Sequence, residues 1–174
     1  MSNYKIDPSH SEVSFKVKHL MISTVTGQFA AFDASMQSES SDFTDAQITF
    51  SADISSISTN NSQRDEHLKS ADFFDAASHP QMTFVSTAMR KKDDENYELD
   101  GELSLRGVSK PVTLQVEYAG RMTDPYGQEK HGFEISGKIN RKDYGLTWSA
   151  VTEAGGVVVS DDVKIAVNAQ FIKG

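Results

Sequence analysis

The sequence predicts an all-β protein, an eight-stranded antiparallel barrel with short helical turns in its long loops. Two observations carry this prediction. Apolar and polar residues alternate at a period of two in successive segments, and no long helical pattern lies between these segments. A strand with one dry face and one wet face produces this alternation. A closed barrel is preferred to a sandwich because closure leaves no exposed edge on strands rich in Val and Phe.

Eight segments are candidate strands. Six of them alternate clearly: His10–Lys18, Asp45–Ile54, Tyr97–Leu105, Val112–Tyr118, His131–Ile139 and Val163–Phe171. The segments Gly27–Gln37 and Gln81–Ala88 alternate less regularly. Phe29 and Phe32 lie three residues apart, so we expect a bulge or bend between them.

Two connections, Ser55–Pro80 and Asn140–Asp161, are much longer than the others. If the strands run up and down in order, both lie at one end of the barrel, together with His19–Thr26 and Arg106–Lys110. The sequence therefore predicts one elaborated end, which we call the mouth, and one plain end.

Both long connections carry helix signals. Asn61 or Ser62 is suited to cap a short helix through Arg64–Lys69. Asn140 is suited to start a single helical turn that stops at Gly145.

Composition excludes several classes of protein. The 174 residues fit one domain, which we assign to residues 1–174. With 17 Lys and Arg against 25 Asp and Glu, the net charge of −8 argues against nucleic-acid binding and against stable insertion into an anionic membrane. The absence of Cys excludes disulfides, thiolate zinc sites and cysteine nucleophiles.

The chain shows no targeting segment. Structured-looking sequence begins at Tyr4, which leaves no room for a signal peptide, and no apolar stretch is long enough to span a bilayer. We therefore expect a cytoplasmic protein, or a periplasmic one if the chain is a trimmed mature form.

The dry face of the strands predicts the barrel interior. The residues expected to line the lumen are Phe15, Val17, Phe29, Ile48, Phe50, Phe84, Leu99, Gly101, Leu103, Leu114, Val116, Phe133, Ile135, Gly137, Ile165 and Val167. Small residues among large ones indicate either tight interdigitation or a continuous tunnel. The clear strands place no Asp, Glu, Lys or Arg on this face. Such an interior suits a long hydrocarbon and favours binding over catalysis.

Three residues at the mouth are candidates for contact with a polar headgroup: His19, Arg64 and Arg141. Acidic residues such as Asp65 and Asp143 lie in the same loops, so the mouth as a whole is not expected to be cationic.

Two groups of residues have the chemical types of a catalytic or metal site, and each also fits a structural role. The stretch Asp7–Ser11 holds the residue types of a hydrolytic triad, but residues so close together on an extended chain are not expected to converge, and a turn feeding the first strand is preferred. The densest set of potential metal ligands is Asp65, Glu66, His67, Asp72, Asp75 and His79. Its spacing matches no established site, so no metal and no cofactor are expected.

Short motifs recur in a fixed order along almost the whole chain. They include Ile6–Ser11, Lys18–Met21, Arg64–Ser70, Arg106–Val108 and Asn140–Leu146. In this order they resemble the YceI-like family, the lipocalin-like polyisoprenoid-binding proteins of bacteria. The resemblance implies an extended eight-stranded lipocalin-like barrel that holds a long amphiphile, with no enzymatic activity attached.

The function expected from these arguments is non-enzymatic binding, transport or storage of a polyisoprenoid, a polyprenyl diphosphate or an isoprenoid quinone. A fatty acid or fatty amide binder is an alternative of the same class. A lipid- or prenyl-phosphate-modifying hydrolase that uses His19, His67 or His79 is an alternative of another class. A solid interior with the loops as a protein-binding surface is a third. A homodimer through outward-facing Ala30 or Phe32 stays open.

Overall fold

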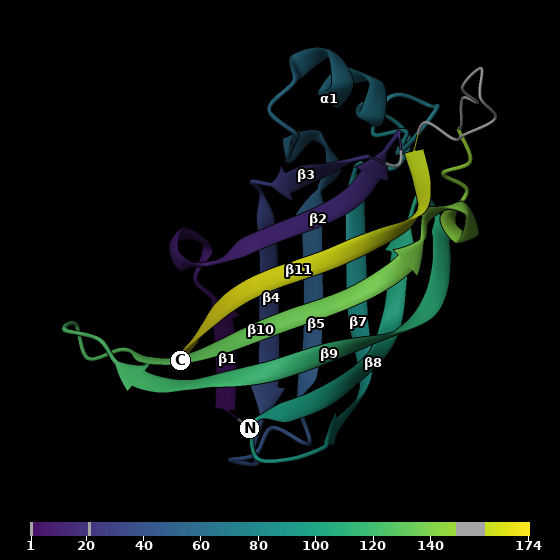
Figure 1. Cartoon of the computed structure of the whole chain (residues 1–174). Helices are drawn as coiled ribbons and strands as arrows, with labels where there is room; N and C mark the ends of the chain where they lie inside the picture. Colours follow the sequence, from purple (N-terminus) through teal and green to yellow (C-terminus); the bar gives the residue numbers. More distant parts are fainter. Residues whose placement is uncertain (1, 21, 149–158) are drawn as a thin grey trace.

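The strands close into an antiparallel barrel in the computed structural model, which describes residues 2–20, 22–148 and 159–174 (Figure 1). The strands are β1 (Ser2–Ile6), β2 (Glu12–His19), β3 (Ser23–Phe29), β4 (Phe32–Ser38), β5 (Gln47–Asp53), β6 (Ile57–Ser58), β7 (Gln81–Lys91), β8 (Asn96–Leu105), β9 (Val108–Thr123), β10 (Glu129–Asn140) and β11 (Val159–Lys173). The helical elements are α1 (Ser62–Lys69) and three 3₁₀ turns, η1 (Pro8–His10), η2 (Ile54–Ser56) and η3 (Arg141–Tyr144).

Eight strands form the closed ring. They pair in the order β1–β4–β5–β7–β8–β9–β10–β11, and β1 also pairs with β11, which completes the circle. Lys5, for example, lies opposite Ser35 on one side and Ile172 on the other. The predicted fold class is confirmed.

β1 and β2 form one interrupted strand, and β3 and β4 form another. β1 and β2 both pair with β11 and are separated by η1, where Pro8 has no N–H to donate to a ladder. β3 and β4 are separated at residues 30–31, so the bend expected between Phe29 and Phe32 is confirmed. Beyond the bend Phe32 pairs with the buried Ala52 and packs partly against the core. The expectation that Phe32 lies on the outer face is therefore wrong, because the bend resets the alternation.

Both predicted helix starts are confirmed. The Asn61 side chain accepts a hydrogen bond from the Arg64 N–H at 3.0 Å at the start of α1. The Asn140 side chain accepts one from the Lys142 N–H at 3.0 Å at the start of η3. That turn ends at Gly145, whose φ of +80° lies in the left-handed region that favours glycine. No helix in the described ranges has the length and apolar character needed to span a bilayer.

The described parts of the two long connections lie at the same end of the barrel, as predicted, and residues 149–158 lie outside the described ranges. Arg106, in the turn between β8 and β9, donates hydrogen bonds to the carbonyl oxygens of both Ala71 and Gly145. Figure 1 shows α1 covering this end, while the β9–β10 hairpin projects away from the barrel on the left. The opposite end is not plain, however, because the loop between β4 and β5 folds Phe43 into it with only 2% of the residue exposed.

The Asp7–Ser11 stretch forms the predicted turn, but its side chains do meet. The Asp7 carboxylate accepts hydrogen bonds from Ser9 Oγ at 2.8 Å and Lys130 Nζ at 3.0 Å, and lies 2.7 Å from His10 Nδ1. Burial alone would raise the pKa of Asp7, but these contacts hold it well below its ordinary value. The expectation that the three residues cannot converge is wrong, because η1 folds them together. Ser9 and His10 both contact the carboxylate rather than one another, which is not the relay of a hydrolytic triad.

Candidate functional site

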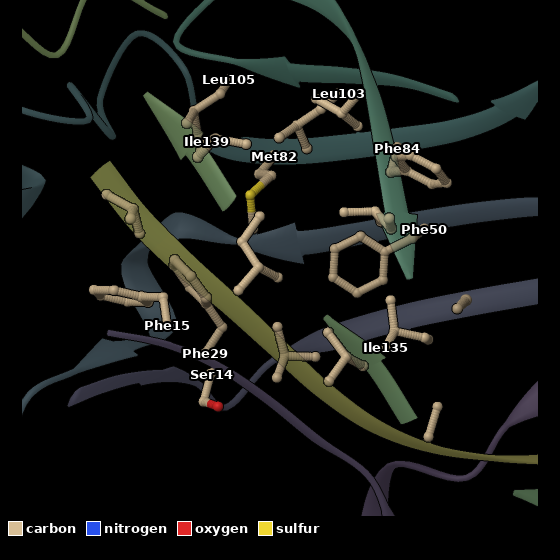
Figure 2. Close-up of a pocket in the computed structure, with 18 of the residues that line it drawn as sticks. Ser14, Phe15, Phe29, Phe50, Met82, Phe84, Leu103, Leu105, Ile135 and Ile139 are labelled. Atoms are coloured by element: carbon tan, nitrogen blue, oxygen red, sulfur yellow. The ribbon is translucent and has the colours of Figure 1, made fainter. Parts of the chain in front are cut away.

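The barrel encloses a cavity of about 190 Å³. Every residue predicted to line the lumen does so, except Gly101 and Gly137. Figure 2 shows side chains from several strands, among them Phe50, Met82 and Leu103, directed toward a common space. The alternation in the sequence therefore correctly places most of the cavity wall.

The two glycines do not open gaps in that wall. A Cβ atom at Gly101 would lie 2.4 Å from Phe84 Cζ, and one at Gly137 would lie 2.4 Å from Leu114 Cδ2. Glycine at these positions lets the neighbouring side chains lie directly on the strand backbone. The tunnel interpretation is wrong for these two positions, which are sites of tight interdigitation.

The cavity wall is almost entirely apolar. Of its described lining residues only Ser14 and Arg141 carry a polar side chain. Ser14 Oγ donates to the Ala166 carbonyl oxygen at 3.0 Å, in the adjacent strand β11. The wall thus presents hydrocarbon and thioether groups, which suit an alkyl or prenyl chain.

Arg141 is buried at the mouth, with 4% of the residue exposed. Its guanidinium group donates to four carbonyl oxygens at 2.6–3.3 Å, those of Leu146, Trp148, Val159 and Ser160. Burial lowers the pKa of Arg141, and the Asp161 carboxylate at 3.9 Å opposes that shift. Arg141 therefore fastens two segments of the chain, and most of its donors are not available to a headgroup.

The other two predicted headgroup residues lie outside the cavity wall. Arg64 donates to Thr59 twice, from Nε to Oγ1 at 2.8 Å and from Nη2 to the carbonyl oxygen at 2.7 Å. His19 ends β2, opposite Val159 on one side and Ser23 on the other. Arg64 thus fixes the entry to α1, while His19 lies at the rim.

Three apolar residues of the α1 connection cover the mouth: Leu68, Phe73 and Phe74. The Phe74 ring lies 6.3 Å from that of Phe29, and the Phe73 ring lies 5.2 Å from that of Trp148. These residues are not among those predicted to line the lumen. The available signal was the apolar pair itself, placed between Asp72 and Asp75 in a polar connection.

The histidines of the hydrolase alternative do not form a catalytic group. His67 Nε2 lies 2.9 Å from Asp72 Oδ2, and the His79 ring packs against Gly107. Within the described ranges no three His, Asp or Glu side chains are grouped so that they could hold a metal ion. Nothing in this arrangement favours the hydrolase.

The opposite end of the lumen is closed by five rings, which we call the floor: Tyr4, Phe43, Tyr118, His131 and Phe133. The partly buried Tyr118 Oη lies 2.7 Å from Nδ1 of the buried His131, and His131 Nε2 lies 3.0 Å from Glu129 Oε2. Burial raises the pKa of Tyr118. The polar ring atoms of Tyr118 and His131 are therefore paired.

A family model described as the YceI-like domain matches residues 4–171. The chain belongs to the YceI-like family. A UPF0312 protein of Staphylococcus epidermidis is 38% identical over 172 residues, which cover 98% of each chain. A UPF0312 protein of Staphylococcus aureus is 36% identical with the same coverage.

Solved structures share the YceI-like fold. A YCEI protein of Campylobacter jejuni has a TM-score of 0.78 at 32% identity, with 90% of each chain covered. BcnA of Burkholderia cenocepacia has a TM-score of 0.83 at 23% identity and covers 95% of this chain and 98% of its own. A polyisoprenoid binding domain from Saccharophagus degradans has a TM-score of 0.72 at 16% identity, with 98% of each chain covered. The last two likenesses concern the fold alone.

Proposed function

We propose that this YceI-like protein binds the hydrocarbon tail of a long-chain isoprenoid lipid in its barrel, as a carrier or store and without chemical turnover. The apolar wall of the enclosed cavity is the observation that carries the proposal. A polar or charged ligand would lose its hydration there and gain almost no hydrogen bonds, whereas a prenyl tail loses only contact with water.

The character of the wall favours a flexible, branched chain. Phe, Leu, Ile and Val side chains line the cavity, together with the methionines Met36, Met82 and Met89. Methionine is unbranched and polarizable, so it adapts to an irregular ligand surface. The description of the Saccharophagus degradans structure as a polyisoprenoid binding domain agrees with this choice of ligand.

The contacts made by the arginines and by His67 at the mouth support a function without turnover. The arginines donate to the protein's own carbonyl oxygens, and His67 is paired with Asp72. General acid–base chemistry needs titratable groups that converge on a reacting atom. The described mouth residues instead hold the cover of the lumen in place.

Native mass spectrometry after gentle purification tests the proposal, followed by addition of a prenyl alcohol such as geranylgeraniol. We expect a bound lipid as isolated, or uptake of the probe in equimolar amount. Palmitic acid and a fatty amide serve as competitors. Preferential uptake of either competitor would replace the isoprenoid by a fatty acyl ligand, and uptake of none of the probes would overturn lipid binding.

A matched pair of variants on one strand locates the ligand. Ala169 on β11 lines the cavity, whereas Ala166 on the same strand is exposed on the outer face. Ala169→Leu should fill the lumen and reduce uptake of the probe at least tenfold, while Ala166→Leu should leave uptake unchanged. Equal uptake by both variants would show that the probe lies outside the barrel.

A further inference from the structure

We propose that Phe43 is the stop of the lumen and sets the longest lipid tail that the protein accepts. This inference rests on the proposed function, since it concerns how far a tail bound in the barrel can reach. It names the property of the lipid that the barrel selects, which is tail length.

The position of Phe43 is the first part of the argument. Phe43 belongs to the connection between β4 and β5, yet its ring lies 5.8 Å from Tyr4 of β1, 5.6 Å from Tyr118 of β9 and 5.4 Å from Phe133 of β10. In the closed ring β1 and β9 are not neighbours, because β10 and β11 separate them on the shorter side. A single ring contacts both only if it lies across the bore of the barrel.

The cavity wall at this end is formed by residues that lie directly in front of the Phe43 ring. Phe133 and Met36 line the cavity, and Phe43 packs behind Phe133 as one of the most completely buried large side chains in the described ranges. Phe43 also packs against Tyr118 and His131, whose polar atoms are paired with each other and with Glu129. A tail that passed Phe43 would have to displace this satisfied polar set with hydrocarbon.

The loop that carries Phe43 is held by two carboxylates. Asp45 accepts hydrogen bonds from Ser38 Oγ at 2.6 Å and from the N–H groups of Glu39 and Ser40 at 2.9 and 3.2 Å. Asp42 accepts from the Thr44 N–H and Oγ1 at 3.1 and 2.7 Å, and from Ser40 Oγ. The ring is therefore presented by a loop whose backbone is fastened on both sides of it.

The backbone at Phe43 is strained. Its φ of +59° lies in the left-handed region, which is unfavourable for any residue with a Cβ atom and unusual for a bulky one. A turn alone would use Gly or Asn there. A strained backbone conformation persists where the surrounding structure enforces it. Here that conformation places a large ring in the bore.

A stop of this kind makes a quantitative prediction. Replacing Phe43 by Ala removes six ring carbons from a closely packed layer, which is space for roughly one isoprene unit of five carbons. The longest tail accepted should therefore increase by about one unit. Replacing a phenylalanine outside the cavity wall should not extend the maximum length, because the tail does not contact it.

The experiment compares three proteins in native mass spectrometry with prenyl alcohols that increase one unit at a time from farnesol. Phe43→Ala should shift the upper length limit by about one unit relative to the wild type. Phe32→Ala, the same substitution at a partly buried position outside the cavity wall, should leave the limit unchanged. Circular dichroism and thermal unfolding establish that each variant is folded, and Phe43→Leu, which keeps most of the packing, should give a smaller shift if Phe43→Ala does not fold.

The outcomes separate this inference from the proposed function. If the wild type binds no homologue at all, lipid binding itself is wrong. If the wild type binds but the limit is the same in the folded Phe43 variants, or moves equally in Phe32→Ala, Phe43 is not the stop and the proposed function stands.

Discussion

The two ends of the barrel are closed by opposite chemistry. At the mouth, arginine side chains donate to backbone carbonyl oxygens, as Arg106 does to Ala71 and Gly145. At the floor, aspartate side chains accept from backbone N–H groups and hydroxyls, as Asp45 does from Ser38 and Glu39. Both kinds of side-chain hydrogen bond satisfy backbone polar groups in irregular segments, where strand pairing does not do so.

Arg106 and Asp45 also differ in how far along the chain their hydrogen-bond partners lie. The bonds made by Arg106 join segments 35 and 39 residues away, whereas those of Asp45 span at most seven residues. When hydrogen bonds join two distant segments, one segment can detach while the rest of the barrel stays folded. A loop whose hydrogen bonds lie within it stays closed on its own. We therefore expect the mouth to open locally and the floor to remain closed, which is what a lumen loaded from one end requires.

The largest effect should come from Arg141→Ala at the mouth. Four carbonyl oxygens near a buried site would lose their donor, and we expect the free energy of unfolding to fall by about 3–5 kcal/mol. Urea denaturation measures this loss. Arg141→Lys should recover little of it, because an ammonium group cannot reproduce the planar fork. Full recovery by Lys would mean that charge alone, and not the set of carbonyl contacts, matters at this position.

Arg106→Ala should have a smaller and more local effect. It removes two hydrogen bonds from a partly exposed side chain, so we expect a loss of about 1–3 kcal/mol in stability. Amide hydrogen exchange should accelerate in α1 and in residues 141–146 but not in residues 39–46. Equal acceleration at both ends would remove the distinction between a mouth that opens and a floor that does not.

The sequence predicts the barrel better than its ends. Alternation identifies a strand face because the side-chain period is fixed, and this was sufficient for residues such as Ile48, Leu99 and Ile165. Alternation contains no information on how a loop side chain folds back into the bore. The sequence alone therefore does not predict that Phe43 enters the bore, although its position between Asp42 and Thr44-Asp45 marks an apolar ring in a polar segment.

The same limit holds at the mouth. Arg64 and Arg141 were assigned to a headgroup from residue type and location, but their partners are Thr59 and a set of carbonyl oxygens. Which acceptor an arginine meets depends on where the long connections fold, and no local pattern predicts that. For Gly101 and Gly137 the sequence leaves tight interdigitation and a tunnel both open, because it does not show which neighbour lies over a glycine.

A comparison of two substitutions measures the strain at the floor. With φ at +59°, Phe43→Gly should be more stable than Phe43→Ala by about 1 kcal/mol, because Gly adopts the left-handed region without the penalty of a Cβ atom. Both variants lose the ring, so the cost of the empty space largely cancels in the difference. Thermal unfolding of the two variants gives the value. If Ala is as stable as Gly, the backbone at this position is not strained in solution.

Acid should loosen the floor before the mouth, which is the smallest of the expected effects. Hydrogen bonds from Ser40 and Thr44 lower the pKa of Asp42 to about 2, and bonds led by that from Ser38 lower the pKa of Asp45. A carboxyl whose pKa is depressed by folding stabilises the native state above its unfolded pKa, and this contribution disappears as the pH falls through the folded pKa. The arginine contacts of the mouth do not titrate in that range. Amide NMR signals of residues 39–46 should therefore shift and broaden between about pH 4 and pH 2 while those of residues 141–146 change less. Asp42→Asn should weaken the acid response of the floor, and an unchanged response in this variant would assign the transition to other carboxyls.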